Sequence, residues 1–170
     1  MPMIMQPNDV NELKMDMLDC PDKLYIGVDV GKSGGIAFIY LDKMYCFKMP
    51  DNPHDLVKLF KNIVDTAPDI NKFCVVEKVW SMPKQGVKSM FTFGYNYGLI
   101  IATISSLSIP YVEVIPNSWM KWFGSMPKDK SERKKHIKAL AFQRYPTNNN
   151  ITLKTSDAIM IATYCKENYK

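Results

Sequence analysis

Runs of apolar residues bounded by turn residues predict a sheet of five strands. Short apolar runs that end at Gly, Asp or Lys are typical of buried strands. The predicted strands are residues 24–30, 36–40, 45–49, 73–79 and 111–115. Residues 32–35, with the sequence KSGG, predict a tight turn after the first strand, and residues 41–43 predict a hairpin connection.

Apolar residues spaced by three and four positions predict helices after the third strand. Residues 53–66 carry Leu56, Leu59, Phe60, Ile63 and Val64 at helical spacing. The other predicted helices are residues 89–107, 116–123, 131–144 and 156–167. Three consecutive strands, followed by helices that alternate with two more strands, predict an α/β fold with a mixed sheet. We expect the first three strands to be antiparallel and the last two to be parallel to the first.

The composition is that of an ordinary globular protein. The chain has 170 residues, of which 46% are hydrophobic and 23% charged, which is typical of one domain. Apolar stretches end well before membrane-spanning length, and no secretory signal is recognised. The four cysteines form no CxxC pair and lie far from both histidines in the sequence, so zinc-site spacing is absent. We therefore expect a soluble intracellular protein with no membrane partner.

Charge divides the chain into two parts. Residues 1–22 contain five acidic residues and one lysine, a net charge of −4, and we expect them to form a flexible acidic leader. Because the whole chain carries +5, the remaining 148 residues carry +9. A basic domain at residues 23–170 suggests a polyanionic partner, although a solvated lysine-rich surface is the simpler alternative.

Three acidic residues stand where the pattern predicts apolar surroundings. Asp29 ends the first strand, Glu77 interrupts the fourth, and Asp157 lies in the first turn of an apolar helix. Taken singly, each has a structural explanation: a turn aspartate, an edge position, or a favourable interaction with the helix dipole. Taken together, two strand ends and a helix start can meet at one edge of an α/β sheet.

Converging carboxylates repel each other unless a cation joins them. Carboxylate and water oxygens are the ligands that Mg²⁺ prefers, and paired ions can activate a water and stabilise the leaving oxygen of a phosphodiester. An acidic metal centre in a basic domain is typical of a nuclease.

These residues lie in segments that resemble a known family. Residues 25–37 read YIGVDVGKSGGIA, residues 76–80 read VEKVW, and residues 157–162 read DAIMIA. In this order they resemble RuvC-type Holliday-junction resolvases, of the RNase H-like nuclease group, and residues 81–98 are most similar to the phage-like and organellar branches. The resemblance covers residues 24–165.

The resemblance implies an RNase H-like three-layer fold, a five-stranded mixed sheet flanked by helices. It implies a homodimer that cuts four-way DNA junctions with paired symmetric nicks, using Mg²⁺ or, in its place, Mn²⁺. Asp29, Glu77 and Asp157 match the family's metal-binding carboxylates. Such a protein is expected in the cytoplasm or nucleoid, or where viral DNA replicates in a host.

One position departs from the family's pattern. The family carries a fourth acidic or His ligand a few residues before the final Asp, and here Lys154 stands three residues before Asp157. A protonated lysine cannot ligate a cation. Lys154 could instead contact the scissile phosphate as a catalytic residue, or the protein could bind junctions with weak or lost nuclease activity.

Further residues are candidates for DNA binding. Trp80 stands where the family carries an aromatic residue that inserts beside unpaired bases, and packing in the core or in a dimer is the alternative. Residues 128–138 hold six basic residues against two acidic ones. The candidate phosphate contacts are Lys84, Lys88, Lys128, Lys130 and Lys134, and a solvated helix face is the alternative for the lysines of residues 128–138.

Two further inferences follow from the pattern. The apolar helix at residues 89–107, with Gly94 and Gly98 spaced for close backbone approach, is the expected dimer interface. The glycine-rich turn after Asp29 also resembles the phosphate motif of actin-like ATPases. Those proteins enclose a nucleotide between two domains, and 170 residues are too few for two.

Overall fold

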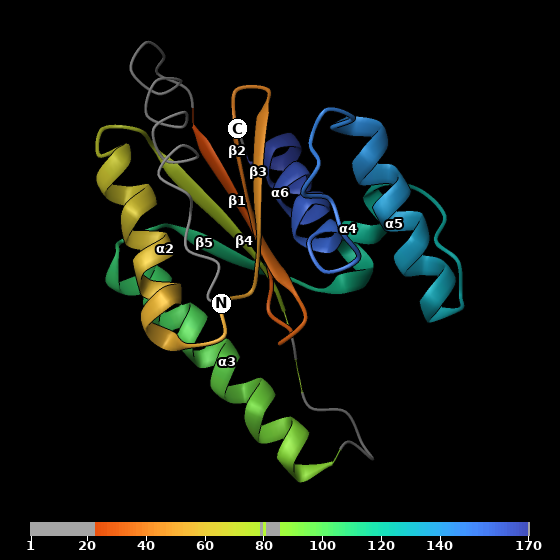
Figure 1. Ribbon diagram of the computed structural model, residues 1–170, viewed down its shortest axis with the longest axis horizontal. Helices are drawn as coiled ribbons and strands as arrows, with labels where there is room; N and C mark the ends of the chain where they lie inside the picture. Colours follow the sequence, from red (N-terminus) through yellow and green to blue (C-terminus); the bar gives the residue numbers. More distant parts are fainter. Residues whose placement is uncertain (1–22, 79, 81–85, 170) are drawn as a thin grey trace.

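The chain forms a five-stranded sheet with helices on both faces (Figure 1). This computed structural model describes residues 23–78, 80 and 86–169, so the predicted acidic leader lies outside the described residues. The strands are β1 (Leu24–Asp29), β2 (Gly35–Tyr40), β3 (Lys43–Lys48), β4 (Lys72–Glu77) and β5 (Tyr111–Val114). The helices are α2 (Pro53–Thr66), α3 (Val87–Ser106), α4 (Pro116–Trp122), α5 (Lys130–Arg144) and α6 (Ser156–Asn168).

The sheet has the mixed topology that the sequence predicts. Its strand order is β3-β2-β1-β4-β5, with β1, β2 and β3 antiparallel and with β4 and β5 parallel to β1. Val28 of β1 pairs with Val76 of β4, so these two parallel strands end side by side. The carboxyl ends of β1 and β4 therefore present the next residues, Asp29 and Glu77, at the same edge of the sheet.

Strand alternation decides which helices these two acidic residues face. Val28 and Val76 belong to the hydrophobic core under α2 and α3, while Val75 belongs to the second core, under α4, α5 and α6. Successive side chains along a strand point to opposite faces. Asp29 and Glu77, each one residue after a valine of the first core, consequently face the layer that contains α6.

Helix α6 packs against β1 with almost no space between the two backbones. Residues 156–163 are all buried. A Cβ atom on Gly27 would lie 2.2 Å from the backbone nitrogen of Ala162 and 2.4 Å from the carbonyl oxygen of Ala158. Only glycine fits at this position, and the close approach brings the first turn of α6 to the end of β1.

Helix α3 is buried along only half of its length. Ile100 and Ile104 are fully buried in the first core, whereas the N-terminal half projects beyond the sheet (Figure 1). A Cβ atom on Gly94 or Gly98 would meet nothing within 4 Å, so the chain itself makes no close contact there. None of the described helices combines the length and the apolar character needed to cross a membrane.

Replacing Gly27 by Ala should destabilise the protein strongly, because the added methyl group would push α6 away from β1. We expect the free energy of unfolding to fall by about 3 kcal/mol or more, measured by urea denaturation. Gly31→Ala is the matched control, since its Cβ would have its nearest contact at 3.7 Å. A change within about 1 kcal/mol is expected there. Equal losses in the two variants would contradict the close-packing argument.

Candidate active site

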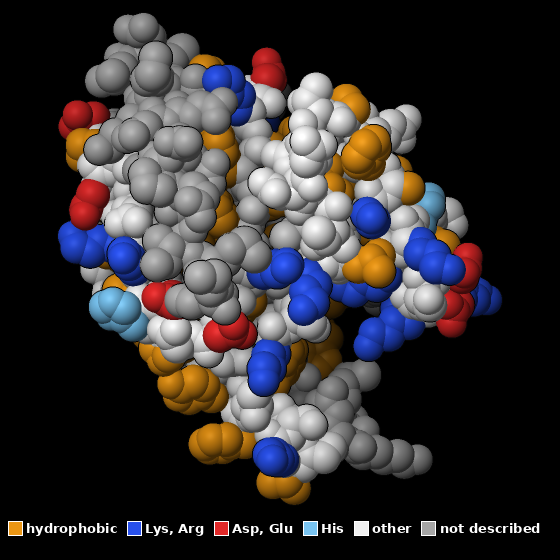
Figure 2. Space-filling model, viewed as in Figure 1, with side chains coloured by type: hydrophobic (Ala, Val, Ile, Leu, Met, Phe, Trp, Pro, Cys, Tyr) orange, Lys and Arg blue, Asp and Glu red, His pale blue; other side chains and the backbone are white. Residues whose placement is uncertain are grey.

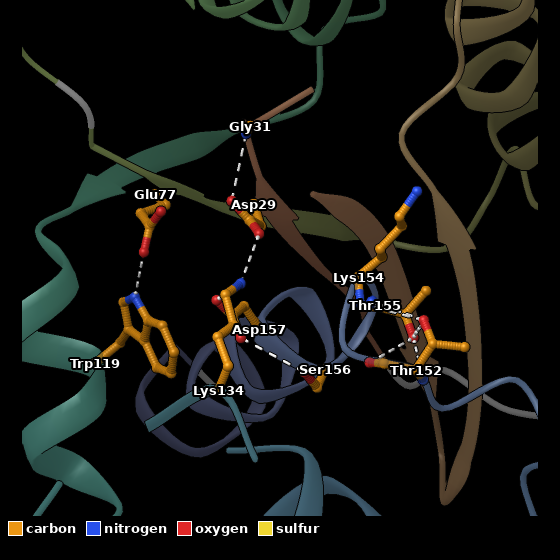
Figure 3. Close-up of polar contacts among 10 residues, drawn as sticks. All are labelled: Asp29, Gly31, Glu77, Trp119, Lys134, Thr152, Lys154, Thr155, Ser156 and Asp157. Carbon is orange, nitrogen blue, oxygen red and sulfur yellow. Dashed lines mark hydrogen bonds and ion pairs between the residues drawn. The ribbon is translucent and has the colours of Figure 1, made fainter. Parts of the chain in front are cut away.

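Three carboxylates come together at the carboxyl edge of the sheet. Asp29 ends β1, Glu77 ends β4, and Asp157 lies in the first turn of α6 (Figure 3). Asp29 and Asp157 are each only 8% exposed, and Glu77 is partly buried. Buried carboxylates are costly unless hydrogen bonds or cations compensate their charge, so the groups around them define what the site can do.

The turn after β1 holds Asp29 in place. The backbone N–H of Gly31 donates to Oδ1 of Asp29 over 3.3 Å, and Gly34 N–H donates to the carbonyl oxygen of Gly31 over 2.7 Å. A Cβ atom on Gly34 would lie 2.2 Å from the carbonyl oxygen of Asp29. The predicted tight turn therefore folds closely over Asp29 and leaves its Oδ2 atom directed toward α6.

Glu77 is held by a tryptophan. The indole Nε1–H of Trp119, a buried residue of α4, donates to Oε1 of Glu77 over 3.0 Å (Figure 3). A hydrogen bond to a carboxylate is stronger than one between neutral groups. It restricts the rotation of Glu77 and leaves Oε2 available for another contact.

A lysine lies between the two aspartates. The Nζ atom of Lys134, on α5, is 2.5 Å from Oδ2 of Asp157 and 3.9 Å from Oδ2 of Asp29. Its side chain is one-third exposed. The sequence pattern predicts that Lys134 contacts DNA from a basic helix. In the structure its ammonium group lies in the acidic cluster.

Burial and mutual repulsion alter the protonation of these groups. Burial, followed by the charge of Asp157, raises the pKa of Asp29 to about 6, although Lys134 acts in the opposite direction. Burial, followed by the charge of Asp29, raises the pKa of Glu77 to about 7, and the Trp119 hydrogen bond opposes the rise. Partial burial lowers the pKa of Lys134, but the carboxylates outweigh it and the net shift is upward.

The charges around the cluster do not balance. The carboxylates of Asp29, Glu77 and Asp157 carry three negative charges when ionised, and Lys134 supplies one positive charge, which leaves −2. Within residues 23–78, 80 and 86–169, no three His, Cys, Asp or Glu side chains are arranged as a ligand set for a metal. The donor atoms nevertheless suit a hard divalent cation, since all of them are carboxylate oxygens. The net charge of −2 also matches the charge of such a cation.

The predicted catalytic lysine lies outside this cluster. Lys154 is exposed, and in Figure 3 its side chain extends away from the three carboxylates. Its backbone N–H donates to Thr152 Oγ1 over 3.2 Å, and the Thr152 N–H donates to Thr155 Oγ1 over 2.8 Å. These hydrogen bonds form a compact turn at the start of α6, and the Lys154 ammonium group faces solvent.

The other predicted DNA-binding residues that the structure describes are exposed. Trp80, just beyond β4, is 50% exposed. Lys88 is exposed near the start of α3, Lys128 and Lys130 are exposed near the start of α5, and Lys84 lies outside the described residues. Figure 2 shows basic side chains gathered around α5 on this face.

Two features of the site were not found from the sequence. The sequence pattern places Trp119 in a short helix and does not link it to Glu77. Lys134 had a usable signal, because Ile137 and Ala141, three and seven residues later, are the buried residues of α5. Residues at this spacing share a helix face, so Lys134 points inward with them.

Solved structures of similar fold identify the architecture of the chain. No family model matches the chain, and a search of curated proteins gives no match in sequence. The structure of Thermus thermophilus RuvC in complex with a Holliday junction substrate is similar, with a TM-score of 0.59 and 10% sequence identity over 84% of this chain and 91% of that one. A second T. thermophilus RuvC structure gives a TM-score of 0.56 and 12% identity over 83% and 92% of the two chains.

The fold is that of RuvC. The RuvC-type, RNase H-like fold predicted from the sequence motifs is thus confirmed, although at 10–12% identity the similarity concerns the fold alone. In this RuvC-like fold, Asp29, Glu77 and Asp157 occupy two strand ends and a helix start that the close packing of α6 on β1 brings together.

Replacing Asp29 by Asn should stabilise the metal-free protein at pH 7.5. The pKa of Asp29 is about 6 in the folded state against an ordinary 3.8, so the folded state binds more protons between these values. The contribution of Asp29 to the free energy of unfolding therefore falls as the pH rises from about 4 to about 6, and it stays low at higher pH. The Asp29→Asn substitution removes this penalty, and the new amide oxygen still accepts the Gly31 hydrogen bond.

We expect the Asp29→Asn melting temperature, measured with EDTA present, to rise by about 3 °C or more at pH 7.5 and to match wild type near pH 3. Asp65→Asn is the control, because Asp65 is an exposed residue paired with Lys61 on the surface of α2. A lower melting temperature for Asp29→Asn at pH 7.5 would show that the carboxylate is not a source of instability.

Proposed function

We propose that the protein is a structure-selective endodeoxyribonuclease that resolves four-way DNA junctions by metal-dependent phosphodiester hydrolysis, giving paired symmetric nicks. The observation that carries the proposal is the convergence of Asp29, Glu77 and Asp157 at the carboxyl edge of a RuvC-like sheet. The similar T. thermophilus RuvC has a Holliday junction as its substrate. A basic surface around an acidic centre supports the same conclusion.

In this proposal the three carboxylates hold Mg²⁺, for which Mn²⁺ can substitute. A divalent metal here would lower the pKa of a bound water and stabilise the leaving oxygen of the phosphodiester. The chain's own contribution is to fix the carboxylates: the turn at Gly31 orients Asp29, Trp119 orients Glu77, and the first turn of α6 presents Asp157. Ligands fixed in this way need no rearrangement at the moment of reaction.

The surface beside the site fits a DNA backbone. A pocket of about 620 Å³ lies between α4 and the start of α5, and the cationic side chains that line it are Lys121, Lys128 and Arg133. Arg133 donates to the carbonyl oxygens of Pro127 and Lys128, which fixes the loop. Phosphate contacts here would set affinity without sequence preference.

The remaining predicted contacts rest on two grounds. Trp80 and Lys130 match positions of the family that the sequence resembles, whereas Lys84, Lys88 and Lys154 are candidates from their place in this sequence. Lys84, Lys88, Lys130 and Lys154 are proposed to contact phosphates. Trp80, half exposed beyond β4, is proposed to stack beside unpaired bases at the crossover, where stacking contributes roughly 1–3 kcal/mol per base.

Paired nicks require two active sites, and α3 is the proposed dimer interface. Val87, Phe91 and Tyr95 lie four residues apart on the projecting half of the helix and are 85%, 76% and 54% exposed. An apolar stripe of this kind is unfavourable in water unless another surface covers it. The open space beside Gly94 and Gly98 would let a second copy of α3 approach closely.

Replacing Phe91 by Glu should convert the dimer to a monomer, because a carboxylate would be buried in the apolar stripe. Sedimentation velocity at micromolar concentration measures this directly. Phe142→Glu is the matched control, since Phe142 is also an exposed phenylalanine but lies on α5. A monomeric wild-type protein, or equal effects of the two substitutions, would contradict the proposed interface.

With Mg²⁺, the wild-type protein should cut a synthetic four-way junction into symmetrically nicked duplexes. Asp29→Asn should reduce the cleavage rate by about 100-fold or more, because a neutral amide cannot replace the charge of the carboxylate. Junction affinity, measured by gel shift without metal, should stay within about threefold of wild type, since Asp29 repels phosphates rather than binding them.

Flap and linear duplex substrates test structure selectivity in the same assay. Tight junction binding by the wild-type protein without any nicking in Mg²⁺ or Mn²⁺ would disprove the nuclease proposal. That result would instead support a junction-binding protein of this fold. The observation that favours this alternative is Lys154, which stands where the family carries a fourth metal ligand.

A further inference from the structure

The acidic cluster already contains a positive charge from its own chain. The Lys134 ammonium group lies 2.5 Å from Oδ2 of Asp157 and 3.9 Å from Oδ2 of Asp29, whereas its neighbour Lys135 reaches only the exposed Glu132 on the outside of α5. Helix α5 begins at Lys130, and the side chain of its N-cap residue, Asp129, accepts from the backbone N–H of Glu132 over 2.9 Å. Because this N-cap fixes where α5 begins, it also fixes which lysine of the helix faces the acidic cluster.

The ammonium group and a metal ion would need the same oxygens. A cation held by Asp29 and Asp157 would bind their carboxylate oxygens, and the Oδ2 atom of each already lies within ion-pair distance of the Lys134 ammonium group (Figure 3). Two cations within about 4 Å repel each other, so each weakens the binding of the other to these oxygens. The long, one-third-exposed side chain of Lys134 gives it a path toward solvent.

We propose that Lys134 is a built-in counterion that competes with the divalent cation for Asp29 and Asp157. The inference rests on the proposed function, since it assumes that these carboxylates hold a metal. In the metal-free protein Lys134 neutralises part of the cluster and keeps the first turn of α6 against the end of β1. Entry of the divalent cation displaces the ammonium group from the carboxylates.

Displacement places a free positive charge next to the metal site. The ammonium group remains tethered to α5, the helix whose residue Arg133 lines the pocket together with Lys121 and Lys128. There it can pair with a phosphate of bound DNA. Lys134 therefore lowers metal affinity in the absence of DNA, and bound DNA offsets that effect by providing the ammonium group with another partner.

The test is Mn²⁺ binding to the full-length protein without DNA, measured by isothermal titration calorimetry after removal of metals with EDTA. Lys134→Met keeps the length of the side chain and removes its charge. We expect it to bind Mn²⁺ about tenfold more tightly than wild type, because the competing charge is gone. Lys135→Met, the matched control on the same helix, should bind like wild type.

Thermal unfolding provides the second measurement. Without metal, Lys134→Met should melt below wild type, because its carboxylates have lost their counterion, and saturating Mn²⁺ should raise its melting temperature more than that of wild type. Should Lys134→Met fail to fold, Lys134→Gln replaces it in both measurements. A lysine that only supports the structure would give weaker Mn²⁺ binding when replaced.

Equal or weaker Mn²⁺ binding by the Lys134 variants, or no binding by any of the proteins, would overturn the inference. Junction cleavage by wild type decides the proposed function separately. If wild type cleaves the junction but Lys134→Met does not bind Mn²⁺ more tightly, only the counterion role is rejected. Tighter binding without any cleavage by wild type supports the counterion role and rejects the nuclease.

Discussion

The direct contact between the backbones of α6 and β1 is the constraint on which the site depends. Gly27 lets the turn of helix at Ala158 and Ala162 lie against the central strand, and no side chain separates them. The first turn of α6 then reaches the end of β1, where Asp29 stands. A wider spacing would leave Asp157 too far from Asp29 for one cation to contact both. The geometry of the candidate active site is thus a consequence of core packing.

The same packing creates an electrostatic problem that the local residues solve only in part. Burial raises the pKa of Asp29 to about 6 and that of Glu77 to about 7, which shows how poorly this edge of the sheet accommodates negative charge. Trp119 and Lys134 each offset some of that cost, one through a hydrogen bond and the other through a charge. The region is less stable than a neutral core would be, and a bound cation would relieve that cost.

Much of this arrangement could be predicted from the sequence because strands and acidic residues leave clear patterns. Apolar runs that contain Asp29 and Glu77 near their carboxyl ends predict both the strands and the acidic residues of the site, and the KSGG segment predicts the tight turn. Contacts between distant elements leave no such pattern. The indole of Trp119 reaches Glu77 across 42 residues, and Lys134 looks like any other lysine of a basic helix unless its register with Ile137 and Ala141 is considered.

The two lysines near the cluster explain how the site differs from the arrangement that the resemblance implies. Lys154 takes the sequence position of a fourth ligand but faces solvent, so it removes a negative charge without adding a positive one to the cluster. Lys134 adds a positive charge from α5. Without a metal, three carboxylates and one ammonium group leave −2. If a divalent cation displaced Lys134, as proposed, the three carboxylates and the cation would sum to −1, and a second divalent cation would give the cluster an excess positive charge unless a phosphate entered with it. Binding of a second cation at this site would therefore depend on the DNA.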